Sequence, residues 1–177
     1  DNTLDIVYNL ETKYELLNVV KESDILPNYQ CKKGKGNQLW KGLHCSKGTI
    51  VLYCDSDLKN FDVRMIYGLI GPLLTTSIQF VKGFYERPLV ISDTVKKSNE
   101  GGRVTELCAR PMLNLLYPEL SGFIQPLGGE YGGYRKVLEN VEYMTGYGVE
   151  VNMLIDILEK YVLKKMGQVD LLKREHR

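Results

Sequence analysis

Hydrophobic residues recur along the chain at two spacings, one typical of helices and one typical of strands. Apolar positions three or four residues apart form one face of a helix, whereas alternating or continuous short runs form a strand. The first spacing predicts helices at residues 11–20, 37–45, 61–69, 105–116, 134–140 and 150–160. The second predicts strands at residues 4–8, 49–54, 78–85 and 167–172. Polar or glycine-rich stretches predict loops at residues 22–36, 88–102 and 122–133, the middle one mobile. Helices that alternate with strands indicate an α/β layered domain.

Composition narrows the class of protein without indicating a function. A chain of 177 residues with 44% hydrophobic and 25% charged residues can form one globular domain. Its formal net charge of +1 gives no argument for nucleic acid or an anionic membrane as a partner. No apolar stretch is long enough to span a bilayer, and the first residues have no signal-peptide pattern. The four cysteines lack C-x-x-C spacing, so we expect free thiols in a reducing cytoplasm.

An apolar run that ends in two acids is the feature that points to chemistry. Residues 50–54 are apolar, and Asp55, Ser56 and Asp57 follow directly. A buried strand has apolar side chains on both faces, so acids at its end need another reason. Hard cations such as Mg²⁺ bind one or two carboxylates together with substrate phosphates. The segment therefore predicts a metal–nucleotide site, although on its own an ordinary aspartate-rich turn is favoured.

Two glycine-containing turns that precede helices are candidate anion sites. Residues 32–36 (Lys-Lys-Gly-Lys-Gly) can present backbone N–H groups and a helix dipole to an anion. They lack the P-loop pattern, and a solvated basic loop is favoured when the segment stands alone. Residues 101–106 (Gly-Gly-Arg-Val-Thr-Glu) add a guanidinium that binds phosphate in a bidentate way. Helix capping by Thr105, with Arg103 exposed, explains this second turn equally well.

Two further polar groups lie near the end of the chain. Residues 146–150 (Gly-Tyr-Gly-Val-Glu) place Glu150 at a helix start, where an acid is favourable for the dipole alone. The functional alternative is a carboxylate that faces sugar hydroxyls. His176 is one of only two histidines. A terminal histidine is usually solvated, but imidazole is also a common transition-metal ligand.

Taken in order, these and other segments resemble glucosyl-3-phosphoglycerate synthase and its mannosyl-transferring relatives. Each motif is weak alone, but eight of them occur in the order and spacing of that family, from about residue 20 onward. They are residues 34–36 with 39–40, 55–57, 67–74, 80–85, 102–107, 125–131, 146–150 and 174–177.

The resemblance implies a fold and a reaction. The fold is a glycosyltransferase A-type domain over residues 1–177, a Rossmann-like mixed sheet flanked by helices. Residues 1–85 would bind the donor and metal, and residues 100–177 the acceptor. The reaction is a retaining transfer of glucose from a nucleotide sugar, UDP-glucose, to 3-phosphoglycerate. Mg²⁺ or Mn²⁺ would be the cofactor, and the family is commonly a cytoplasmic homodimer.

The resemblance also assigns roles to single residues. Asp57 and His176 match the metal ligands. The donor-binding positions are Lys35, Asp55, Ser56, Tyr147, Gly148, Val149, Glu150 and Arg174. The acceptor-binding positions are Gly102, Arg103, Val104 and Thr105. Asp57 and Glu150 are the two catalytic residues, and Glu150 would orient the donor sugar rather than act as a covalent nucleophile.

The chain also departs from the family. A first strand with a Pro-Ala-x-x-Glu-like stretch and an Asp-Ser/Gly-Gly-Ser-Thr-type loop are not found, and the chain stops where the family continues. We therefore expect a fragment of a longer chain without its N-terminal strand or strands, and with an incomplete base-binding pocket. A mannosyl-transferring or GDP-sugar-dependent enzyme stays open, as does a catalytically inactive α/β binding module. A nucleotidyl- or phosphoryltransferase would leave the match at residues 102–106 unexplained.

Overall fold

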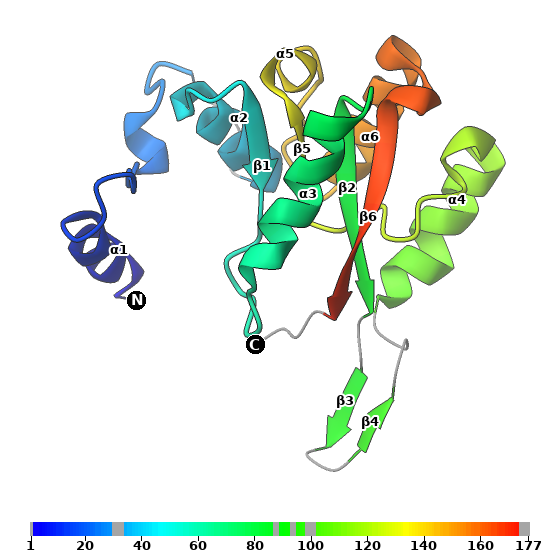
Figure 1. Cartoon of the computed structure of the whole chain (residues 1–177), viewed down its shortest axis with the longest axis horizontal. Helices are drawn as coiled ribbons and strands as arrows, with labels where there is room; N and C mark the ends of the chain where they lie inside the picture. The colour runs from blue at the N-terminus through cyan, green and yellow to red at the C-terminus, as the bar shows by residue number, and fades with distance from the viewer. Residues whose placement is uncertain (1, 30–33, 87–88, 93–94, 98–101, 174–177) are drawn as a thin grey trace. The chain divides into compact units, whose positions relative to one another are not determined.

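The computed structural model describes residues 2–29, 34–86, 89–92, 95–97 and 102–173 of the chain (Figure 1). The chain divides into two compact units, Asp1–Lys32 and Lys33–Arg177. No helix of the described residues is both long and apolar enough to cross a membrane.

The first unit differs from the prediction at both of its elements. It holds helix α1 (Thr3–Glu11) and a short 3-10 turn, η1 (Glu22–Asp24), so the predicted strand at 4–8 and helix at 11–20 are both wrong. Five residues are too few to separate a period of 2 from one of 3.6. Beyond α1, residues 12–20 form turns and irregular structure, and Val19 N donates a hydrogen bond to Glu11 Oε1 at 2.6 Å.

The second unit is built on a mixed four-stranded sheet in the order β1-β5-β2-β6. The strands are β1 (Ile50–Tyr53), β2 (Phe80–Glu86), β5 (Tyr131–Tyr134) and β6 (Met166–Lys173). Strand β5 is antiparallel to both neighbours, and β6 is parallel to β2. The ends of β1 and β2 therefore lie at the same edge of the sheet as the start of β5, and polar residues at these positions meet there.

The helices of this unit occur close to where the sequence predicts them. They are α2 (Lys35–Cys45), α3 (Val63–Thr75), α4 (Arg110–Leu116), α5 (Arg135–Leu138) and α6 (Val149–Tyr161), with short turns η3 (Pro118–Leu120) and η4 (Leu163–Lys165). A π-helical stretch, η2 (Thr105–Ala109), leads into α4. Such single π turns are rare and often occur at functional sites.

Two hydrophobic clusters cover the two faces of the sheet. On one face, Met65, Leu69 and Leu73 of α3 pack against Val81 and Leu171. On the other, α2, α4 and α6 contribute to a larger cluster around the sheet residues Val51, Tyr53, Phe80 and Tyr131. Figure 1 shows α3 across one face and α6 behind the sheet. This three-layer arrangement is the predicted α/β architecture.

Helix α3 is longer than predicted because it continues through Gly71 and Pro72 to Thr75. A proline inside a helix removes a backbone hydrogen bond and normally ends or kinks the helix. Here Leu73 is fully buried, which favours continuation. The hydroxyls of Thr75 and Thr76 donate to the carbonyls of Gly71 and Pro72 at 2.9 and 2.7 Å, so the last turn is satisfied.

Two predicted loops contain strands. Residues 88–102 include an antiparallel hairpin of β3 (Leu89–Ser92) and β4 (Val95–Lys97). Residues 122–133 lead into β5, whose sequence Tyr-Gly-Gly-Tyr does not read as a strand because glycine is depleted in strands. The glycines are required by close packing: a Cβ at Gly132 would lie 2.5 Å from the Val51 carbonyl oxygen, and one at Gly133 would lie 2.6 Å from that of Gln79.

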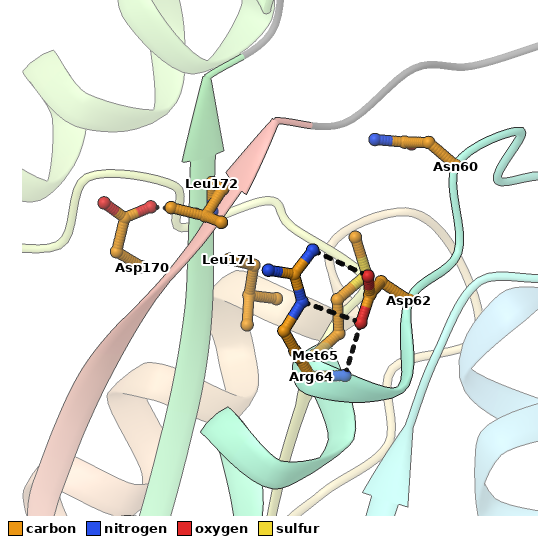
Figure 2. A pocket seen from close by; sticks show the side chains of 7 residues that line it. All are labelled: Asn60, Asp62, Arg64, Met65, Asp170, Leu171 and Leu172. Atoms are coloured by element: carbon orange, nitrogen blue, oxygen red, sulfur yellow. Dashed lines mark hydrogen bonds and ion pairs between the residues drawn. The ribbon is translucent and has the colours of Figure 1, made fainter.

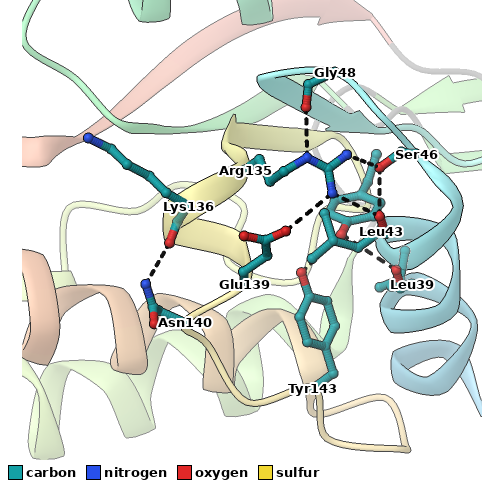
Figure 3. A network of polar contacts seen from close by, with 10 residues as sticks. Leu39, Leu43, Ser46, Gly48, Arg135, Lys136, Glu139, Asn140 and Tyr143 are labelled. Carbon is teal, nitrogen blue, oxygen red and sulfur yellow. Dashed lines mark hydrogen bonds and ion pairs between the residues drawn. The ribbon is translucent and has the colours of Figure 1, made fainter.

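A polar network around Arg135 fixes the end of α2 (Figure 3). The guanidinium donates to the carbonyl oxygens of Leu43 and Gly48 at 3.1 and 2.9 Å and to the hydroxyl of Ser46 at 2.7 Å. The last carbonyls of a helix lack partners within it, and a cation there is also favoured by the helix dipole. This network anchors the helix whose other end begins with Lys35.

Candidate active site

Lys35 is held between two carboxylates that come from distant parts of the sequence. Its Nζ lies 3.1 Å from Oδ1 of Asp55 and 2.7 Å from Oε1 of Glu150. Lys35 opens α2, Asp55 follows β1 and Glu150 lies in the first turn of α6. The structure therefore brings together three of the residues that the resemblance assigns to the donor.

The three side chains of these two ion pairs differ in burial. The Glu150 side chain is only 4% exposed, whereas those of Lys35 and Asp55 are 27% and 30% exposed. Burial lowers the pKa of Lys35, but hydrogen bonds and charge from Glu150 and Asp55 outweigh it, and the net pKa is raised. Lys35 is therefore a fixed cation, open to solvent on one side, where an anionic ligand can reach it.

Glycines allow the elements of this site to approach one another closely. A side chain at Gly36 would overlap the Met144 carbonyl oxygen, and one at Gly34 would overlap that of Thr145. The start of α2 therefore lies directly on the segment before α6. At Gly129 a side chain would overlap the Asp55 carboxylate, so this carboxylate rests on the backbone before β5.

A layer of buried polar groups lies beneath Lys35, and Lys82 is its centre. The strand register places Tyr53 of β1, Tyr131 of β5 and Lys82 of β2 side by side. Lys82 is 1% exposed; its Nζ donates to the Gly128 carbonyl oxygen at 2.6 Å and lies 4.4 Å from the Tyr131 ring centre. Burial lowers the pKa of Lys82 to about 7, while the charges of Glu150, Glu130 and Asp55 oppose this shift.

Tyrosine hydroxyls complete the buried layer. Burial, and then the negative charge of Glu150, raise the pKa of Tyr131, so the phenol is neutral. Among the described residues, no hydrogen-bond partner reaches its hydroxyl. The Tyr53 and Tyr143 hydroxyls lie 2.9 Å apart, and burial raises the pKa of Tyr53 to about 12.

Sequence reasoning missed Lys82, Glu130 and Tyr131. Glu130 is 1% exposed and Tyr131 is fully buried. One signal was available, since Lys82 interrupts an otherwise apolar and aromatic strand. A charged residue in a buried strand needs a partner or a function.

The remaining predicted residues lie around this group or outside the described part of the chain. Ser56 and Asp57 are exposed, as is Tyr147, while Val149 is fully buried. Arg174 and His176 lie outside the described residues, so their predicted roles stay predictions. Among the described residues, no three His, Cys, Asp or Glu side chains form a group that could hold a metal ion.

The predicted acceptor turn lies at the start of the helix that contains η2. Gly102 has φ +91°, a conformation that glycine adopts readily, and its carbonyl accepts a hydrogen bond from Glu106 N at 3.1 Å. Arg103 and Val104 are exposed, and Thr105 is 4% exposed. The Arg103 guanidinium is therefore accessible to a ligand.

An open pocket of about 500 Å³ lies near the end of β6 (Figure 2). It is lined by Asn60, Asp62, Arg64, Met65, Asp170, Leu171 and Leu172. Arg64 forms an ion pair with Asp62 at 2.8 Å, and its hydrogen bonds lower the pKa of Asp62 to about 2. A much smaller void, too narrow to admit a water molecule, shares Met65 and Leu171 with this pocket and is also lined by Glu130.

Comparison with known proteins finds similar glucosyl-3-phosphoglycerate synthases. No protein-family model matches the chain. Glucosyl-3-phosphoglycerate synthase from Petrotoga mobilis is 50% identical over 159 residues, which are 89% of this chain and 49% of that protein. The same enzyme from Mycolicibacterium smegmatis is 46% identical over 160 residues, 90% of this chain and 52% of that protein. Over about 90% of its own length, the chain is therefore similar to members of the glucosyl-3-phosphoglycerate synthase family.

Solved structures of a glucosyl-3-phosphoglycerate synthase are also similar to the chain. The Mycobacterium tuberculosis enzyme with Mg²⁺ and UDP matches with a TM-score of 0.83 and 39% identity, over 100% of this chain and 57% of that one. Its complex with Mn²⁺, UDP-glucose and phosphoglyceric acid matches with a TM-score of 0.79 and 42% identity, over 90% and 52%. The predicted mixed α/β fold is confirmed. The chain spans about half the length of the glucosyl-3-phosphoglycerate synthases it matches.

Proposed function

We propose that this chain acts as a retaining, metal-dependent glucosyltransferase that moves glucose from UDP-glucose to 3-phosphoglycerate. The product would be glucosyl-3-phosphoglycerate. The observation that carries the proposal is Lys35 fixed between Asp55 and Glu150, which unites three residues of the predicted donor site. The M. tuberculosis relative that binds Mn²⁺, UDP-glucose and phosphoglyceric acid supports the choice of ligands.

The metal-binding proposal rests on Asp57. Its exposed carboxylate follows the turn after β1, and carboxylate oxygens suit Mg²⁺ and Mn²⁺. Mg²⁺ keeps several waters and needs only one or two carboxylates together with substrate phosphates, so this donor fits. We assign Asp57 to the ion, with His176 as a second ligand. A bound ion would neutralise charge on the leaving diphosphate.

Donor binding would use both charge and hydrogen bonding. Lys35 and Arg174 would attract the diphosphate, and Asp55 and Ser56 would contact the nucleotide. Residues 147–150 would face the sugar, where Glu150 can accept hydrogen bonds from its hydroxyls. Because Glu150 is buried and already paired with Lys35, it is well placed to orient the sugar and poorly placed to act as a nucleophile.

The acceptor would bind at residues 102–105. The Arg103 guanidinium can hold a phosphate in a bidentate way, and this would fix the acceptor hydroxyl against the anomeric carbon. Thr105 would complete the turn.

We further propose that the protein is a cytoplasmic homodimer. We also propose that residues 55–57 act as an Asp-x-Asp motif.

The test is acceptor-dependent release of UDP. The protein is incubated with UDP-glucose, Mn²⁺ and 3-phosphoglycerate, and UDP is measured with and without the acceptor. Asp57→Ala should lower the rate at least about a hundredfold, because the ion loses a ligand. Asp62→Asn is the control, since this aspartate is partly exposed and lies in the same connection. GDP-mannose and GDP-glucose test the alternative donors, and release with none of these donors would support the inactive binding module instead.

A further inference from the structure

Lys82 is the most buried cation among the described residues of the second unit, and the proposed function does not use it. It is 1% exposed in the middle of β2, with a hydrophobic cluster on each face of the sheet. Bringing a lysine into such a place is unfavourable unless its polar head is satisfied. A methionine or leucine would fill the same space without the cost of removing a polar group from water. The contacts of the Nζ atom therefore need an explanation.

The contacts of Nζ point to that task. It donates to the Gly128 carbonyl oxygen at 2.6 Å, across 46 residues of sequence. Gly128 lies in a turn in which its own N–H donates to the Gln125 carbonyl at 3.0 Å. The Asp55 carboxylate packs directly against the backbone of the next residue, Gly129. Lys82 therefore holds the residue that precedes the contact point of Asp55.

The groups around Nζ keep it directed toward the Gly128 carbonyl oxygen. The Tyr131 ring lies beneath it at 4.4 Å, and β5 holds that ring by its register with β1 and β2. The backbone beyond Gly129 is held as well, because Gly83 N donates to the Glu130 carbonyl at 2.8 Å. The charged groups around Nζ are Glu150 of α6, Glu130 before β5, Asp55 after β1 and Lys35 of α2.

We propose that Lys82 is a positioning residue of the donor site: through Gly128 it holds the turn of residues 125–129 against the Asp55 carboxylate, and so sets the place of Asp55 beside Lys35. This inference rests on the proposed function for the identity of the ligand. The contact of Lys82 with the turn stands on the structure alone. Groups that orient a binding residue in this way commonly change affinity about 10- to 100-fold when they are removed.

Two measurements on the same variants distinguish an effect on the turn from an effect on ligand binding. Lys82→Met removes the donor atom and keeps the bulk of the side chain, and Lys82→Arg keeps a donor. Lys136→Met is the matched control, since Lys136 also lies over a tyrosine ring, that of Tyr134 at 6.0 Å, but is exposed. Hydrogen exchange is followed over residues 123–131, and binding of UDP with Mn²⁺ is followed by calorimetry.

We expect Lys82→Met to exchange faster at residues 125–130 than the unaltered chain, with other segments unchanged, and to bind UDP with Mn²⁺ at least about tenfold more weakly. Lys82→Arg should lie between the two, and Lys136→Met should match the unaltered chain. Unchanged exchange at residues 125–130 would overturn the proposal, as would faster exchange in every segment, because Lys82 would then support the fold in general. If the unaltered chain binds no UDP, the proposed function fails, and the exchange result alone decides the positioning role.

Discussion

Two lysines of the site have opposite electrostatic environments, and this difference defines their roles. Lys35 is partly exposed and touches two carboxylates, so its pKa is raised and its charge is constant. Lys82 is buried against a carbonyl oxygen and an aromatic ring, and burial lowers its pKa to about 7. The first is suited to attract an anion, and the second to donate a hydrogen bond inside the protein.

The lowered pKa of Lys82 predicts a pH-dependent stability. Below about pH 7 the lysine is protonated in both the folded and the unfolded chain, and the full cost of burying its charge remains. Between about pH 7 and the ordinary lysine pKa of 10.5, the unfolded chain holds a proton that the folded chain does not. Stability should therefore rise with pH in this window, by up to about 1.4 kcal/mol per pH unit.

Urea unfolding at about pH 7, 8 and 9 measures this slope. Lys82→Met has no such group, so the free energy of unfolding of the unaltered chain minus that of the variant should increase with pH. Tyr53 works in the opposite direction only above about pH 10, because its pKa is about 12 in the folded chain. A difference that stays flat or falls across the window would contradict the lowered pKa.

At this scale the sequence was informative where residues belong to a motif. Lys35, Asp55 and Glu150 were predicted for one site, and the structure brings their side chains together. Lys82, Glu130 and Tyr131 were not predicted, because their importance depends on the pairing of β1, β5 and β2. That pairing joins residues about 50 to 80 positions apart and leaves no local pattern.

Among the elements, helix α2 shows how glycine positions decide what a helix can pack against. Gly36 and Gly42 both lie in α2, but they face different environments. A Cβ at Gly36 would overlap the Met144 carbonyl oxygen, whereas a Cβ at Gly42 would have no atom within 4 Å. The same residue type is therefore required by packing at one position and only tolerated at the other.

This contrast predicts opposite effects of the same substitution. Gly42→Ala should stabilise the chain by about 0.5–1 kcal/mol, because alanine loses less backbone entropy in a helix. Gly36→Ala should destabilise it by about 1–3 kcal/mol, because a backbone carbonyl must move to admit the methyl group. Urea unfolding of both variants beside the unaltered chain measures the difference, and equal effects at the two positions would show that α2 does not lie on residues 144–145.

Element prediction failed where packing overrides local preference. Helix α3 continues past Pro72 because its last turns bury Leu73 and have hydroxyl partners. Strand β5 contains two glycines that neighbouring strands require. The short apolar pattern of residues 4–8 predicts a strand, whereas these residues lie in helix α1. By contrast, α2, α6 and β2 have long, regular patterns and were predicted closely.

At the scale of the whole molecule, both hydrophobic clusters lie in one unit. All residues of both clusters lie between Leu39 and Leu171, within the unit Lys33–Arg177. No residue of α1 is buried. The sequence indicates one α/β domain over residues 1–177, and this stays a prediction. The apolar side chains of residues 4–20 suggest core elements, but none of them belongs to either cluster.

The position of the clusters predicts that the second unit unfolds independently. A chain of residues 33–177 should keep a single cooperative urea transition by far-UV circular dichroism, with a free energy of unfolding within about 0.5 kcal/mol of that of the full chain. The reason is that its core remains complete. Leu154→Ala in the full chain is the comparison, because it truncates a fully buried side chain and should lower stability by about 2–5 kcal/mol. A shortened chain as unstable as Leu154→Ala would mean that residues 1–32 contribute to the core.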